Sequence, residues 1–147
     1  MRRVETGEFY SGEVLLKLFQ GREFKAQKYL EKTLDVVLEG IEKLGISKDE
    51  PIHVCTGYIF TKVREDLKSR GYKLTPVKVA GATQELAERE FVKSLVRLGV
   101  GDEREVAEMR SFDSFLEWVL QDLEGRERFV KTGWPSWPRL RESGEPS

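Results

Sequence analysis

The sequence contains no asparagine, one cysteine and one histidine among its 147 residues. A lone Cys55 cannot form an intramolecular disulfide, and with His53 alone the chain has no Cys/His set of the kind that holds a structural zinc ion. We therefore expect no metal ion and no cofactor. Scarce thermolabile residues beside a surface rich in Lys, Arg and Glu are typical of thermophile proteins.

Long apolar runs and an excess charge of one sign are also lacking. No run approaches the length that spans a bilayer, and the start of the chain lacks the pattern of a secretory signal. The formal net charge is -1, so the chain as a whole is not drawn to nucleic acid or to a membrane surface. We expect a cytoplasmic protein without a membrane partner.

The central stretch, residues 51–84, has the pattern of a βαβ unit. A short apolar run at Ile52 to Cys55 indicates a buried strand, and the four-residue recurrence of Ile59, Val63 and Leu67 indicates a helix. Gly71 is a typical helix stop, and the chain returns to the sheet at 73–79. A right-handed connection would place both strand ends at the same edge of a parallel sheet.

The flanking sequence extends this pattern in both directions. Residues 2–19 predict an antiparallel hairpin with its turn at Tyr10-Ser11-Gly12, followed by a long helix over 24–44. Further helices are expected over 83–98, from Asp102 to about Met109, and from Ser111 to Gly125. The predicted fold class is α/β, a mixed sheet with an N-terminal antiparallel hairpin and a parallel βαβ core, flanked by helices.

Two turns at the predicted sheet edge are candidate anion sites, because ligands of open α/β sheets bind beyond the carboxyl ends of the strands. Each turn leads into a helix N-terminus, where free N–H groups favour an anion such as phosphate. The alternative is that these are ordinary turn and cap residues. The candidates for anion binding are Thr56, Gly57, Lys62, Gly81, Thr83 and Gln84.

Cys55 and His53 are weaker candidates for chemistry. The phosphate-cradling arrangement of protein tyrosine phosphatases, Cys followed by five residues and Arg, does not occur, because Thr61 stands where the Arg would be. We predict a buried, unreactive thiol at Cys55 and a hydrogen-bonded strand residue at His53.

The last part of the chain changes character. Residues 126–141 contain five basic residues, one acidic residue and the segment G-W-P-S-W-P, which predicts an extended tail over 126–147 beside a single domain over 1–125. The favoured role is a clasp on the domain or a homo-oligomer contact, and the alternative is nucleic-acid binding by Trp with Lys and Arg. The contact candidates are Lys131, Trp134, Trp137, Arg139 and Arg141.

The order of the predicted elements over about residues 2–98 resembles the ribonuclease H-like fold. That resemblance implies carboxylates that hold divalent metal ions and cleave a phosphodiester. Glu39 corresponds to the family's helix carboxylate, and Glu88 or Glu90 to its last one. The family's first-strand Asp is missing, and Cys55-Thr56-Gly57 stands at the next acidic position.

Two functional hypotheses follow from these patterns. The first is a non-catalytic binding or assembly protein, and the second is a nucleic-acid-processing or phosphate-handling enzyme of ribonuclease H-like shape. The missing acidic pair favours the first.

Overall fold

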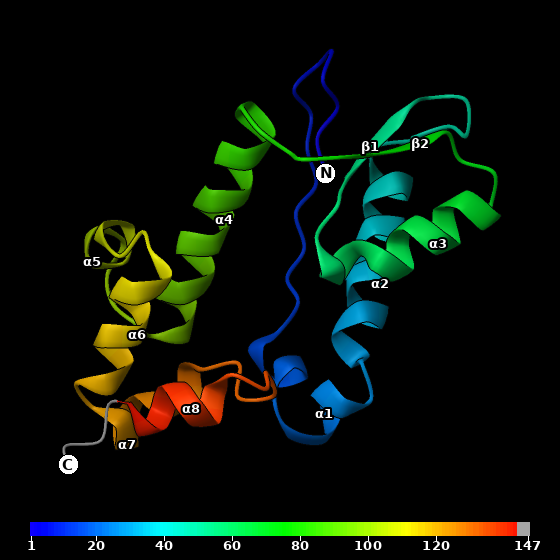
Figure 1. Cartoon of the computed structure of the whole chain (residues 1–147). Helices are drawn as coiled ribbons and strands as arrows, with labels where there is room; N and C mark the ends of the chain where they lie inside the picture. Colours follow the sequence, from blue (N-terminus) through cyan, green and yellow to red (C-terminus); the bar gives the residue numbers. More distant parts are fainter. Residues whose placement is uncertain (144–147) are drawn as a thin grey trace. The chain divides into compact units, whose positions relative to one another are not determined.

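The computed structural model describes residues 1–143, and it is mainly helical. Its described part contains one sheet of two parallel strands, β1 (Ile52–Cys55) and β2 (Leu74–Val77) (Figure 1). The prediction of an α/β fold with a larger mixed sheet and an N-terminal antiparallel hairpin is therefore wrong. In the described residues, the predicted sheet is reduced to β1 and β2, which α3 (Thr61–Ser69) connects.

The remaining elements are all helical. They are η1 (Leu16–Phe19), α1 (Gly21–Lys25), α2 (Lys28–Lys43), η2 (Tyr58–Phe60), α4 (Ala82–Leu98), α5 (Glu103–Glu108), α6 (Phe112–Leu120), α7 (Leu123–Arg126), η3 (Glu127–Phe129) and α8 (Trp137–Glu142).

The chain forms two compact units. Unit 1 consists of Met1–Val14 and Gln27–Glu88, and unit 2 consists of Leu15–Ala26 with the chain from Arg89 onward. The boundary predicted at residue 125 lies inside unit 2.

The predicted N-terminal hairpin gives way to packing against a helix. Arg2 and Phe9 form an isolated antiparallel bridge, and the second predicted strand is replaced by η1. Gly12 lies so close to α2 that a Cβ there would be 2.6 Å from Cγ1 of Val36. The missing side chain at Gly12 therefore permits close approach to a helix instead of a hairpin turn. The Leu-rich segment that follows suits helical backbone, because Leu is a strong helix former.

The predicted long helix is divided at Gln27. Its backbone adopts the left-handed conformation, with φ 55° and ψ 30°, between the end of α1 and the start of α2. This conformation is unfavourable for a residue with a side chain, and no turn residue in the sequence announces it.

Several local predictions are confirmed. Gly71 has φ 84°, and the Tyr72 N–H donates to the Leu67 carbonyl at 3.0 Å, which is the expected closure of α3. Asp102 and Glu105 form a reciprocal capping box at the start of α5. Ser111 accepts the Ser114 N–H at the start of α6. These signals depend only on neighbouring residues, so tertiary packing leaves them intact.

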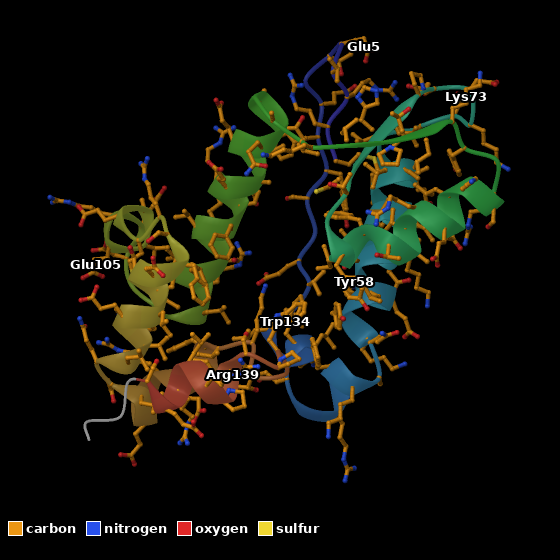
Figure 2. All side chains as sticks on the ribbon, in the orientation of Figure 1. Glu5, Tyr58, Lys73, Glu105, Trp134 and Arg139 are labelled. Carbon is orange, nitrogen blue, oxygen red and sulfur yellow. The ribbon has the colours of Figure 1, made fainter. Side chains whose placement is uncertain are left out.

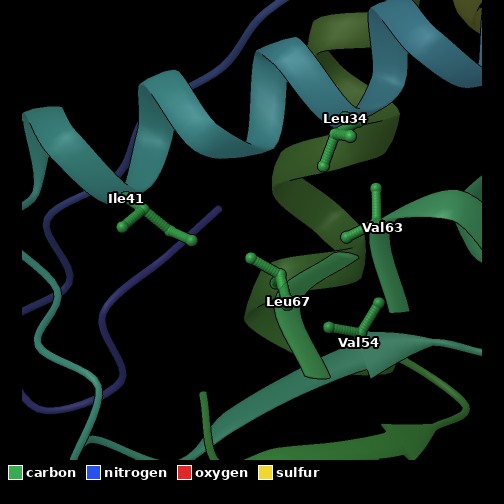
Figure 3. Packing of buried hydrophobic residues seen from close by; sticks show 5 residues of the cluster. All are labelled: Leu34, Ile41, Val54, Val63 and Leu67. Carbon is green, nitrogen blue, oxygen red and sulfur yellow. The ribbon is translucent and has the colours of Figure 1, made fainter. Parts of the chain in front are cut away.

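The core of unit 1 lies between its two larger helices and the sheet. Figure 3 shows the side chains that α2, β1 and α3 contribute to it converging on one another, and Val63 and Leu67 are fully buried. The cluster consists of Leu34, Ile41, Val54, Val63 and Leu67. Because one face of each element is buried in this way, the apolar spacing of both helices reads correctly from the sequence.

Unit 2 has a separate set of buried side chains. They are Phe19, Val100, Val106, Val119 and Trp137. No residue of α4, the helix expected over 83–98, is buried, and Phe91 is 50% exposed. The Phe91 ring instead makes an edge contact with Phe115, with centroids 6.0 Å apart.

Candidate functional site

The loop that follows β1 is organised by Arg64 of α3. Its Nη1 donates to the Cys55 carbonyl at 2.6 Å and to the Gly57 carbonyl at 3.1 Å, and its Nη2 donates to Thr61 Oγ1 at 3.4 Å. A charged donor thus satisfies two carbonyls that leave the strand. In the sequence, Arg64 is the first Arg after Cys55, and it lies too far along the chain for the phosphate-cradling pattern of tyrosine phosphatases. Its actual role becomes visible once the helix turns it back toward the strand.

Three backbone N–H groups of this loop, those of Thr56, Gly57 and Phe60, already have partners. The Thr56 N–H donates to the Val77 carbonyl at 3.1 Å, and the Phe60 N–H donates to the Gly57 carbonyl at 3.0 Å. The Gly57 N–H points to Cys55 Sγ at 3.4 Å. A phosphate at the start of α3 would have to compete with these contacts.

Lys62, the cation predicted to serve this loop, lies near a carboxylate. Lys62 Nζ lies 3.7 Å from Glu31, whose other oxygen is 2.9 Å from Lys28 Nζ. The Lys28 ammonium, chiefly through its hydrogen bond, lowers the pKa of Glu31, and Lys62 adds to the effect. The positive charge of Lys62 is therefore shared with a carboxylate.

The second predicted turn lies at the start of α4. Gly81 follows the last residue of β2 by four positions and accepts the Glu85 N–H at 3.0 Å. Gln84 Nε2 donates to Glu88 at 2.9 Å, and Thr83 is half-buried. In residues 1–143 no hydrogen bond or ion pair joins this turn to Thr56 or Gly57. A joint anion site of the two turns stays a prediction.

A tyrosine pair next to the same loop was missed by sequence reasoning. Tyr29 of α2 is 2% exposed and Tyr58 is 54% exposed, with ring centroids 6.5 Å apart. Gln27 Nε2 donates to the Tyr58 hydroxyl at 3.4 Å. Burial, followed by the hydrogen bond with Tyr58, raises the pKa of Tyr29. No local spacing links residues 29 and 58, so only the fold brings them together.

The remaining chemical candidates of unit 1 lie apart. His53 is exposed on β1, and Cys55 is partly exposed rather than buried as expected. Glu39 is exposed on α2 and accepts a hydrogen bond from Tyr10. Within the described part of the chain, no three His, Cys, Asp or Glu side chains are grouped closely enough to hold a metal ion.

In unit 2, two segments more than 100 residues apart in sequence are joined by hydrogen bonds. Gln20 Nε2 donates to the Arg128 carbonyl at 3.2 Å and to the Val130 carbonyl at 2.7 Å. The Gly133 N–H donates to the Phe19 carbonyl at 2.9 Å. These contacts join residues 128–133 to the end of η1 and to Gln20, which precedes α1.

The two tail tryptophans have different environments. Trp137 is 7% exposed, and its Nε1 donates to Glu127 at 2.9 Å. Trp134, labelled in Figure 2, is 38% exposed. Its ring meets that of Phe24 in an edge contact, with centroids 5.2 Å apart and an interplanar angle of 63°. The tail is also less extended than predicted, because α8 begins at Trp137. Pro138 sits in the first turn of α8, where its missing N–H costs little.

Both of the joined segments carry exposed cations. Lys131 Nζ lies 4.3 Å from the Phe19 ring centroid, and Arg128 lies 4.7 Å from that of Phe129. Desolvation by neighbouring atoms lowers the pKa of Lys131. Arg141, in contrast, pairs with Glu127 at 3.1 Å. We call the following exposed side chains the basic surface: Lys17, Arg22, Lys25, Arg128, Lys131 and Arg139.

The members of the basic surface have no carboxylate partner among residues 1–143. Four of them, Lys17, Arg22, Lys25 and Arg139, are also free of ring contacts in that range. The mixture of Trp, Lys and Arg in the sequence indicated Lys131 and Arg139 of this surface as contact candidates, but not Arg128. Sequence reasoning missed the cations of the other segment, because Lys17 to Lys25 carry no motif.

Unit 2 also has a shallow hollow of about 460 Å³ along α6. It is lined by Asp113, Leu116, Glu117, Leu120 and Gln121. All of these side chains belong to one helix or its C-terminal end, so the hollow is a furrow on a helix face and not an enclosed pocket.

Comparison with models of known protein families, with curated proteins and with solved structures finds no match to this chain. Among residues 1–143, no helix combines the length and the apolar character needed to cross a bilayer.

Proposed function

We propose that the chain is a non-catalytic binding protein that holds an anionic partner on the basic surface of unit 2. One observation carries this proposal. Two segments far apart in the sequence, which hydrogen bonds of Gln20 join, each carry exposed cations without carboxylate partners among residues 1–143, although the whole chain has a formal net charge of -1.

The distribution of charge elsewhere supports a local binding site. At the end of β1, Lys62 faces Glu31, and the Arg64 guanidinium is used on backbone carbonyls. On the basic surface the cationic groups remain available to a partner. Gathering like charges without a partner is unfavourable, and a polyanion would relieve their repulsion and release its own counterions.

The proposal is tested with inorganic polyphosphate, which carries closely spaced charges and no other recognition group. Calorimetric titration at several salt concentrations should give a logarithm of affinity that falls linearly with the logarithm of salt. The slope counts the contacts, so the triple variant Lys17→Ala, Lys25→Ala, Arg139→Ala should reduce it by about half.

A matched control removes the same charge from unit 1. Lys43, Lys68 and Lys78 are exposed and make no ion pair among the described residues. Their replacement by Ala should leave the salt slope of polyphosphate binding nearly unchanged. Equal losses in the two triple variants, or no binding by the native chain, would overturn the proposal.

Three other expectations remain predictions. They are the ribonuclease H-like enzyme, the anion site of the two turns, and the homo-oligomer formed through the tail. A Mn²⁺ titration in which Glu39 and Glu88 or Glu90 proved necessary for binding would favour the enzyme.

A further inference from the structure

We infer that the partner of the basic surface is single-stranded nucleic acid, with a base stacked on Trp134. This inference rests on the proposed function and adds the class of partner. Its starting point is the position of Trp134, a large aromatic side chain that is 38% exposed beside Lys131 in a chain segment fixed at both ends.

The Trp134 ring is held in place before any ligand arrives. Its backbone N–H donates to the Lys131 carbonyl at 3.2 Å, and the preceding Gly133 is bonded to Phe19. The edge contact with Phe24 further restricts the ring. A ring ordered in advance loses little conformational freedom when a flat ligand stacks on it, so more of the stacking energy appears as affinity.

A second flat group lies in the same segment. The Arg128 guanidinium stacks over Phe129 at 4.7 Å, and the residue is exposed. Guanidinium planes and aromatic rings are the two surfaces on which unpaired bases stack in single-strand complexes. Phosphates between the bases would meet the flexible side chains of Lys17, Lys25 and Arg139, which have no other partner among residues 1–143.

Other polyanions would contact the cations of the basic surface but would not stack on Trp134. An acidic peptide supplies carboxylates for the cations but has no obligatory ring for Trp134. In a nucleic-acid duplex the bases are already stacked and paired, so they are not free to stack on protein side chains. A single strand alone offers phosphates and free base faces together.

The test uses fluorescein-labelled oligo(dT) and oligo(U) of about 15 nucleotides, a typical length for a single-strand site. Fluorescence anisotropy measures their affinity for the native chain and for the variant Trp134→Ala. Loss of one stacked base should weaken oligonucleotide binding about tenfold, while polyphosphate binding stays unchanged. Trp134→Phe keeps a smaller ring and should restore part of the affinity.

Phe112→Ala is the matched control, because it also removes an exposed aromatic side chain, 65% exposed, from unit 2. Circular dichroism of each variant shows whether it is folded, and quenching of the native tryptophan fluorescence by oligonucleotide gives a readout that needs no variant. The two oligonucleotides distinguish DNA from RNA as the preferred source of the same chemistry.

The outcomes separate this inference from the proposed function. If Trp134→Ala binds polyphosphate and oligonucleotide as the native chain does, stacking is absent and the inference fails while the proposed function stands. Tighter binding of duplex or of poly-glutamate than of single strands would overturn the inference in the same way. Failure of every polyanion to bind would overturn both.

Discussion

At the scale of single residues, Gln27 holds a backbone conformation that its side chain disfavours. The left-handed region costs a residue with a Cβ about 1 to 2 kcal/mol relative to right-handed helix, and glycine avoids this cost. Glycine also loses more backbone entropy on folding, about 0.5 to 1 kcal/mol. We expect Gln27→Gly to raise the free energy of unfolding by about 0.5 to 1 kcal/mol, measured by urea denaturation.

Gln27→Ala is the control for this prediction. It also removes the hydrogen bond to Tyr58 but keeps the Cβ, so the difference between the two variants reports the backbone term alone. A Gly variant no more stable than the Ala variant would mean that the left-handed conformation carries no cost here.

Tyr29 makes the stability of the protein sensitive to alkaline pH. Its pKa in the folded chain lies above the ordinary value of 10.0, because burial and the hydrogen bond with Tyr58 favour the neutral phenol. A group whose pKa is raised on folding stabilises the folded state below its unfolded pKa and loses that contribution as pH rises. Stability should therefore fall from about pH 10 upward, through the folded pKa of Tyr29.

Absorbance of tyrosinate measures this titration directly in a chain with four tyrosines. The native protein should show a component that ionises above pH 10, and Tyr29→Phe should reduce its amplitude. Tyr58→Phe should reduce the shift without abolishing it, because burial is the larger cause. A late component that persists in Tyr29→Phe at the native amplitude would contradict the assignment. A reduced remainder is expected from Tyr10, whose pKa is raised mainly by its hydrogen bond with Glu39.

At the scale of elements, the tail of unit 2 depends on a close approach between Gly133 and α1. A Cβ at residue 133 would overlap the ring of Phe24. We expect Gly133→Ala to separate the tail from α1 and to lower the free energy of unfolding by about 2 kcal/mol, as other overpacked substitutions do. Thermal unfolding followed by circular dichroism measures the loss.

Ser136→Ala is a suitable comparison in the same segment. Ser136 is exposed, and its side chain makes no capping hydrogen bond to α8. Its replacement should change stability by less than about 0.5 kcal/mol. If Gly133→Ala were equally mild, the tail would be able to move away from Phe24 without cost, and the packing of Trp134 would not be a fixed feature.

At the scale of the whole molecule, the helices were more predictable than the sheet. The caps at Asp102 and Ser111 and the stop at Gly71 are set by residues within one turn, so they read correctly from the sequence. The predicted N-terminal strands are absent from the described structure. A strand requires a second strand to pair with, and the segment from Val14 to Phe19 pairs with none and forms η1. The lack of a side chain at Gly12 allows the N-terminal segment to pack closely against α2 and not against a second strand.

Only the part of the candidate site that is formed by neighbouring residues was predictable from the sequence. Trp134, Trp137, Lys131 and Arg139 lie close together in the sequence, and their composition indicates a contact surface. Lys17 and Lys25 lie more than 100 residues away and carry no motif, so their place beside the tail depends on contacts such as that of Gln20 with Val130.

The sequence by itself determined the caps at Asp102 and Ser111, the stop at Gly71, the apolar faces of α2 and α3, the parallel pair β1 and β2, and the mixture of aromatic and basic residues in the tail. Each of these follows from spacing and chemistry within a few residues. Only the tertiary structure decided that Arg64 caps the end of β1, that Tyr29 meets Tyr58, and that two distant segments share one basic surface. Such contacts join residues far apart along the chain, and packing, not local propensity, selects them.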